Sequence, residues 1–433
     1  MEPILPSSFS DFPEDVQLCI LSWLHQSELE AFACTSKNFF TLCNNDERLW
    51  FLKCSRRWGS QTRIKKWGGG KISYRNLFHL LNDYESLIGF WNYDYYDRRY
   101  ASPSQLLLFE WGLFYITGYR VFPSKCGGYD VVKKPFLWIT ATSDGQTLNY
   151  LDMTETLSLT ENDLSCEDSE KLRSPGLILV DIDLSEDRCL KLRENRQFLE
   201  LRKLLDTGSG GEDQYEIVYR SDPDGLMRQI YEILPSKTSS KKEKWRARRR
   251  VHRWHTESFL KIMNLFPTPP RPLQGLWKGI GPKKSLNLYL VSYREDRDYI
   301  CCVVVGSDST PRFFCEPIFS TRTTAFAEFP LSFEEEHAYN TRPHLRPVAK
   351  SNQAGHDRAT PFQDEDLDVL RMCYAFSPHY PYHRGSFEHP DGRVWLYADG
   401  TFGFGFLRDD YIVDLKPMVK NGRLIDAIRC SNE

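Results

Sequence analysis

The spacing of apolar residues changes at Gly89, and this change constrains the fold more than any other feature of the chain. Before Gly89, apolar residues recur every three or four positions, which is the period of amphipathic helices. After it, short stretches rich in aromatic and β-branched residues alternate with polar ones, which is the period of strands. The sequence therefore predicts an α+β protein, in which a small helical region precedes a large antiparallel β region.

Length, composition and charge set broader limits. The 433 residues exceed what one hydrophobic core usually serves, while 41% hydrophobic and 27% charged residues is ordinary globular usage. A net charge of −3 argues against binding nucleic acid or membrane surfaces through long-range attraction. Because no secretory pattern and no long apolar run is visible, we expect a protein of the cytoplasm or nucleus. Its cysteines, such as Cys19 and Cys34, are then expected to be reduced and buried.

Four short helices are predicted between residues 12 and 58. The second is expected to begin at Ser27, because Ser27 and Glu30 have the spacing of a capping box. The third is expected near Ser36 and the fourth near Asp46. The first presents one apolar face, made of Val16, Cys19, Ile20, Trp23 and Leu24. Such a thin core is marginal alone, so the region is expected to gain stability from a partner.

This region resembles the F-box family. The resemblance rests on five pieces in order: Phe12-Pro13-Glu14-Asp15-Val16, Ile20-Leu21-Ser22-Trp23-Leu24, Leu29 to Phe32, Asp46-Glu47-Arg48-Leu49-Trp50 and Arg56-Arg57-Trp58-Gly59. A plain helical core is the alternative, but packing alone does not require this ordered set. The resemblance implies binding to a Skp1-like adaptor and, through it, to cullin and RING subunits. The implied adaptor-binding residues are Phe12, Pro13, Val16, Ile20, Leu24 and Leu29, with Trp50 supporting them from behind.

The β region shows a possible internal duplication. Gly89-Phe90-Trp91 and Gly275-Leu276-Trp277 are each followed by a pair of predicted strands. We therefore predict these segments: a flexible tail 1–7, the F-box 8–58, a helical connector 59–86, a β-barrel-like domain 87–425 and a tail 426–433. Within the barrel-like domain, two related halves, 87–235 and 272–425, are expected to be joined by a helical segment, 240–266.

A late hairpin is the clearest local structure in the β region. Asp399-Gly400 is a two-residue turn signal, because both residues tolerate positive φ. Pairing outward sets Tyr397 opposite Phe402, Trp395 opposite Phe404, Leu396 opposite Gly403 and Val394 opposite Gly405. One face is then aromatic and the other small, which suits a strongly bent sheet such as a barrel wall.

Most of the chain also resembles the F-box only protein 31 family and its plant relatives. The matching pieces are Gly89-Phe90-Trp91, Gly112-Leu113-Phe114, Lys244 to Phe266, Gly275 to Gly279 and Gly403-Phe404-Gly405-Phe406. The resemblance implies a β-barrel domain that recognises protein substrates within a ubiquitin ligase. It also implies a receptor without catalytic residues, because other subunits of such complexes transfer ubiquitin.

A basic run, Lys241 to Trp254, admits two interpretations. It is either the solvated face of a helix or a nuclear-localisation signal. A continuation of apolar residues through Phe259, Ile262 and Met263 at helical spacing favours the helix.

Catalytic and metal-binding patterns are not apparent. His379, His383 and His389 are separated by prolines, so a surface loop is expected there rather than a metal site. Cys301 and Cys302 are adjacent in a predicted strand and cannot both face one side, so buried thiols are expected. No cofactor and no metal are therefore expected.

Three functions remain open for the β region. It is a receptor for protein substrates, a lipocalin-like barrel that binds a small ligand, or a hydrolase that carries an F-box. The substrate-binding residues are unknown, and Trp91 and Trp277 are the candidates. Trp277 is either a core plug or a pocket wall, while strand alternation turns Lys278 to the other face.

Overall fold

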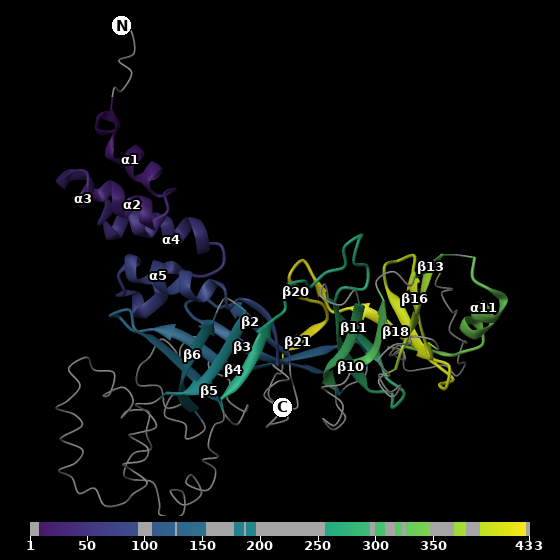
Figure 1. The fold of residues 1–433 in the computed structure, drawn as a ribbon. Helices are drawn as coiled ribbons and strands as arrows, with labels where there is room; N and C mark the ends of the chain where they lie inside the picture. Colours follow the sequence, from purple (N-terminus) through teal and green to yellow (C-terminus); the bar gives the residue numbers. More distant parts are fainter. Residues whose placement is uncertain are drawn as a thin grey trace, which may run out of the picture. The chain divides into compact units, whose positions relative to one another are not determined.

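A computed structural model describes most of the chain outside several loops (Figure 1). The described residues are 8–93, 106–125, 128–152, 177–185, 188–195, 256–294, 299–307, 317–322, 326–328, 330–346, 368–377 and 390–429. Two compact units can be distinguished. One comprises residues 1–88, 109–119 and 135–258, and the other comprises residues 89–108, 120–134 and 259–433. None of the described helices is long and apolar enough to cross a membrane.

Short helices form the N-terminal region, as predicted (Figure 1). They are η1 (Phe9–Asp11), α1 (Glu14–Leu21), α2 (Gln26–Ala33), α3 (Lys37–Cys43), η2 (Asp46–Trp50), α4 (Phe51–Trp58), η3 (Ile64–Gly70) and α5 (Tyr74–Glu85). Ser36 caps α3 by accepting from the Phe39 amide, so its predicted start is confirmed. The predicted start of α2 at Ser27 is wrong. Instead, the His25 amide donates to Glu28 Oε2 over 2.6 Å, which sets the helix start two residues earlier.

The first sheet closes into an antiparallel barrel. Its strands are β1 (Gly89–Tyr93), β2 (Leu106–Trp111), β3 (Ile116–Pro123), β4 (Val131–Ala141), β5 (Thr147–Asp152), β6 (Leu177–Ser185), β7 (Cys189–Glu194), β8 (Glu257–Lys261) and β21 (Ala427–Arg429). Their order is β21-β4-β3-β2-β1-β8-β7-β6-β5, and β4 also pairs with β5. That last pairing closes the ring, which removes exposed edges that would otherwise invite aggregation.

The second sheet is curled and contains the C-terminal strands. It comprises β9 (Gly275–Ile280), β10 (Leu286–Arg294), β11 (Tyr299–Ser307), β12 (Pro317–Arg322), β13 (Phe326–Glu328), β14 (His344–Leu345), β15 (Val369–Ala375), β16 (Gly392–Tyr397), β17 (Phe402–Phe406) and β18 (Ile412–Pro417). The order is β12-β11-β10-β9-β18-β17-β16-β15-β13. A bridge between Ser320 and Phe376 links β12 to the end of β15. Outside the sheet are α11 (Phe333–Asn340) and a small hairpin of β19 (Val419–Lys420) and β20 (Arg423–Leu424).

The two Gly-apolar-Trp segments open separate sheets. Gly89 begins β1 with φ 119° and Gly275 begins β9 with φ 125°, so both glycines adopt nearly the same left-handed backbone conformation. Trp91 and Trp277 therefore lie in two different sheets. The internal duplication itself stays a prediction.

Two predicted segment assignments are wrong at their ends. The helix expected to continue through Phe259 is strand β8, because Phe259 and Leu260 alternate between a buried and an exposed position while pairing with β1. The basic run Lys241 to Trp254 lies outside the described residues. The expected tail 426–433 begins with strand β21, which pairs in parallel with β4.

The register predicted for the late hairpin is wrong by one residue. Trp395 pairs with Gly403 and Leu396 with Phe402. The reason is a longer turn: the Tyr397 amide bonds to the Thr401 carbonyl, and the Asp399 carboxylate accepts from the Thr401 amide and hydroxyl. As a result, the aromatic rings of β16 do not oppose those of β17. The phenylalanines of β17 enter the core, and the glycines lie on the face of Trp395 and Tyr397.

Candidate adaptor-binding surface

Helix α1 turns part of its apolar side towards solvent. Its buried residues are Gln17, Leu18 and Leu21, whereas Val16 is 39% and Ile20 is 40% exposed. Gln17 lies on the buried side, where its side-chain amide donates to the Phe12 carbonyl over 2.7 Å. Three implied adaptor-binding residues, Pro13, Val16 and Ile20, are therefore exposed. They follow one another at spacings of three and four residues, which places them on one face of the helix.

Trp23 extends this exposed stripe, although the sequence analysis did not include it among the adaptor-binding residues. Its side chain is 71% exposed, and the Arg56 guanidinium lies 3.6 Å from the ring centroid. Arg56 is itself held by Ser22, whose hydroxyl accepts from it over 2.6 Å. Trp23 lies seven residues after Val16 and three after Ile20, and this spacing was the available indication that it shares their face. The residue is thus exposed and oriented before any partner binds.

The remaining implied residues do not all lie on that surface. Phe12 and Leu24 are half-buried, while Leu29 and Trp50 are each 2% exposed and belong to the core. Burial excludes direct contact of these two side chains with a partner in this conformation. The expectation that Cys19 and Cys34 are buried is also wrong, because both thiols lie on outward positions of α1 and after α2.

Trp50 connects the F-box region to helix α5. Its ring packs edge-on against Phe78 with centroids 5.4 Å apart, and Arg75 lies over it at 5.4 Å. Asp46 further supports this junction. Its carboxylate accepts hydrogen bonds from the Tyr74 amide at 2.9 Å and from the Arg75 amide at 2.8 Å. These two amides belong to the first turn of α5, which lacks intrahelical partners. The F-box region and the connector are therefore joined by packing and by helix capping.

Comparison with known proteins agrees with this geometry. Residues 9–51 match the F-box domain. The chain is also 37% identical over 430 residues to F-box protein At3g12350 of Arabidopsis thaliana, and the match covers 97% of both chains. The chain belongs to the F-box protein family. F-box domains generally bind Skp1-like adaptors in SCF complexes, which supports a substrate-adaptor role for this F-box protein in general terms.

The second sheet of this F-box protein has a filled interior. Its core cluster takes side chains from β9, β10, β11, β12, β15, β16, β17 and β18. Trp277 is part of it: the ring packs edge-on against Phe402 at 4.7 Å, and its N–H donates to the Leu273 carbonyl over 2.9 Å. These contacts give Trp277 the role of a core plug rather than a pocket wall. A small ligand inside this sheet would have to displace the cluster.

Lys278 faces away from that core, as strand alternation predicts. Its side chain is 1% exposed, and burial lowers the pKa of its amine, although the Asp426 carboxylate opposes this effect. Trp91, the counterpart of Trp277, is fully buried in β1, with the Lys261 amine 5.6 Å from its ring centroid. Neither Trp candidate is exposed for substrate contact.

The described cysteines and histidines show no arrangement for catalysis or metal binding. Cys301 and Cys302 are buried in β11, and burial raises the pKa of Cys301 to about 11, which disfavours the reactive thiolate. Among the described residues, no group of three His, Cys, Asp or Glu side chains could hold a metal ion. The candidates His379, His383 and His389 lie outside the described residues.

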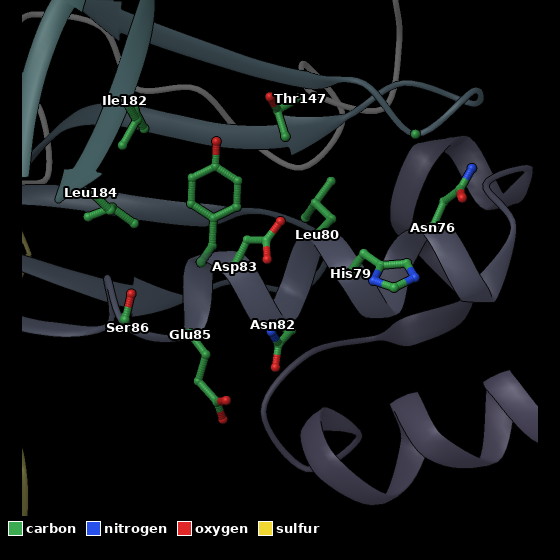
Figure 2. A pocket seen from close by; sticks show the side chains of 12 residues that line it. Asn76, His79, Leu80, Asn82, Asp83, Glu85, Ser86, Thr147, Ile182 and Leu184 are labelled. Atoms are coloured by element: carbon green, nitrogen blue, oxygen red, sulfur yellow. The ribbon is translucent and has the colours of Figure 1, made fainter. Parts of the chain in front are cut away.

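Sequence reasoning missed a polar pocket next to the connector. It has a volume of about 890 Å³ and is lined by α5 together with residues of the β4–β5 turn, β5 and β6 (Figure 2). Leu77, Leu80, Leu81 and Tyr84 recur at helical spacing within the predicted connector 59–86, and they lie in α5. Nothing in that pattern indicated which strand would lie opposite.

Proposed function

We propose that this F-box protein is the substrate-recognition subunit of an SCF-type ubiquitin ligase. Its F-box binds a Skp1-like adaptor, which carries the cullin and RING subunits, and its β domain binds a protein substrate. Ubiquitination then leads to proteasomal degradation of that substrate. The observation that carries the proposal is the exposed stripe formed by Val16 and Ile20 of α1 together with Pro13 and Trp23, which flank the helix.

The stripe has the properties of a binding surface. Exposed apolar side chains grouped on one helix face commonly mark protein contacts, and a Trp with a stacked Arg is a frequent energetic anchor. Because ubiquitin is transferred by other subunits, the proposal needs no catalytic group in this chain. We place the complex in the cytoplasm or nucleus, which imaging of a fluorescent fusion would test.

The double substitution Val16→Ser with Ile20→Ser tests adaptor binding. Both side chains are exposed, so the fold should be retained, while co-precipitation of the Skp1-like adaptor should fall at least about tenfold. A matched control is Leu370→Ser with Leu407→Ser, which removes two exposed leucines of the second sheet region. Undiminished adaptor binding by the first pair would contradict the assignment of this surface.

Substrate capture can be tested in the same cells. The adaptor-deficient double variant should retain substrates without delivering them for ubiquitination. Quantitative mass spectrometry should therefore find proteins enriched on this variant that also accumulate on the wild-type protein when the proteasome is inhibited. If no protein shows both behaviours, the degradation role fails.

A further inference from the structure

The pocket of about 890 Å³ beside α5 combines an apolar wall with a polar rim. Leu80, Ile182 and Leu184 contribute aliphatic surface, and Figure 2 shows the two β6 residues on the strand side, opposite the α5 residues that carry the polar groups. Asn76, His79 and Thr147 supply hydrogen-bonding groups. Its volume is in the range of ligand pockets and exceeds the space that one side chain fills.

Tyr84 provides a further flat surface in this pocket. The Tyr84 side chain is half-buried, and burial raises the pKa of its hydroxyl, although hydrogen bonds with Thr147 and Asn149 partly offset this rise. These bonds attach the last turn of α5 to strand β5. The ring is therefore held in place as part of the pocket lining, and an aromatic ring can contact a cation or an alkyl chain through its face.

The Asp and Glu side chains of the pocket lining give it negative charge, and the basic side chain of the lining is His79. Its lining includes Asp83 and Glu85 but no Lys or Arg. The two carboxylates differ in availability: Glu85 already forms an ion pair with Arg57, whose other nitrogen donates to Asn82 over 3.0 Å. Asp83 is exposed and forms no ion pair or hydrogen bond within the described part of the chain. Asp83 is therefore the acidic group left to meet an incoming positive charge.

We propose that this pocket binds a Lys or Arg side chain presented by an extended segment of the protein substrate. This inference rests on the proposed receptor function. The alkyl stem of the basic residue lies along Leu80, Ile182 and the Tyr84 ring, because such stems pack on apolar surfaces while their charged ends stay hydrated. The charged end pairs with Asp83. The neighbouring amide, imidazole and hydroxyl groups bind the polar backbone of the same segment.

Two pools of fluorescein-labelled nonapeptides test the proposal. The pools share randomised flanks and differ only at the central residue, which is Arg in one and its uncharged isostere citrulline in the other. Fluorescence anisotropy with the full chain should show about fivefold tighter binding of the Arg pool, as expected for one solvent-exposed ion pair. The preference should decline as salt concentration rises.

Variants then locate the binding. Asp83→Asn should remove the Arg preference, whereas Asp410→Asn, at an exposed carboxylate between β17 and β18, should retain it. Ile182→Ser should weaken binding of both pools. Equal binding of the two pools, absence of binding, or an undiminished preference in Asp83→Asn would each overturn the proposal.

The receptor function can be judged separately. Adaptor co-precipitation should be unchanged in Asp83→Asn, because the substitution lies outside the stripe on α1. If the wild-type protein binds the adaptor but shows no Arg preference, only the pocket assignment fails. If it does not bind the adaptor at all, the proposed function fails whatever the peptides show.

Discussion

Lys278 Nζ donates to the Asp426 carboxylate over 2.8 Å, and it also donates to the backbone carbonyls of Tyr129 at 2.8 Å and Ile425 at 3.3 Å. The three protons of one buried ammonium are thus all used. Through them, β9 is tied to the turn before β4 and to the residues that precede β21. Lys278 therefore links separate segments of the chain through hydrogen bonds, whereas Trp277 beside it packs in the apolar core.

Lys278→Met should lower the free energy of unfolding by about 2–4 kcal/mol. Met keeps most of the packing volume but leaves the two carbonyls without this donor. Because Asp426 is half-exposed, its freed carboxylate contributes little to the cost. Urea denaturation measures this free energy. The control is Lys420→Met, at an exposed lysine of β19, which should change the free energy of unfolding by less than about 0.5 kcal/mol. Equal effects of the two substitutions would refute the assigned role.

Gly403 faces Tyr397 so closely that a side chain cannot be added without movement. A Cβ at this position would lie 2.2 Å from the Tyr397 hydroxyl oxygen and 2.8 Å from Asp414 Oδ1. Gly403→Ala should therefore cost about 1–3 kcal/mol of stability through overpacking.

The same substitution in a Tyr397→Phe background should cost less, because the nearest atom is gone. A double-mutant cycle read by thermal or urea unfolding should give a coupling of at least about 0.5 kcal/mol. Strictly additive losses would mean that the clash is not with the hydroxyl.

Asp414 should make the free energy of unfolding depend on pH. Burial raises the pKa of this carboxyl, but hydrogen bonds from His344, Arg346 and Tyr397 and the charge of His344 outweigh burial, so its pKa lies below the ordinary 3.8. A carboxyl whose pKa is lower in the folded state stabilises the fold, and this contribution is complete at pH values above the unfolded-state pKa. It is lost as the pH falls through the folded-state pKa. The loss should therefore occur below about pH 4.

Asp414→Asn tests this dependence through urea midpoints at pH 7, 5 and 3. The variant should be less stable than the wild type by about 2 kcal/mol at pH 7 and 5, and the difference should shrink at pH 3. Asp410→Asn should follow the wild type at every pH. A difference between Asp414→Asn and wild type that stays constant down to pH 3 would exclude the proposed linkage.

Asp46 should contribute to the stability of the connector helix. Asp46→Ala removes the acceptor of the Tyr74 and Arg75 amides and should cost about 1–2 kcal/mol, the usual effect of losing a helix cap. Hydrogen exchange at those two amides should become faster. Glu47→Ala, at an exposed neighbour in the same turn, is the control. Unchanged exchange in Asp46→Ala would show that the cap does not limit local opening.

Features of the fold that depend on near neighbours could be predicted from the sequence. The cap at Ser36 acts over three residues, and the start of that helix was predicted correctly. The opposite directions of Trp277 and Lys278 follow from strand alternation, which is a property of the backbone itself. The F-box assignment belongs to this group as well, because its motif lies within about fifty consecutive residues.

Other features were decided only by contacts between distant segments. Both sides of α1 carry apolar residues, so burial of Leu18 and Leu21 rather than Val16 and Ile20 depended on the other helices of the F-box. The pocket likewise exists because β6, which is far from α5 in the sequence, lies opposite that helix. Periodicity reports which residues share a face, but the free energy of burial depends on what that face meets in three dimensions.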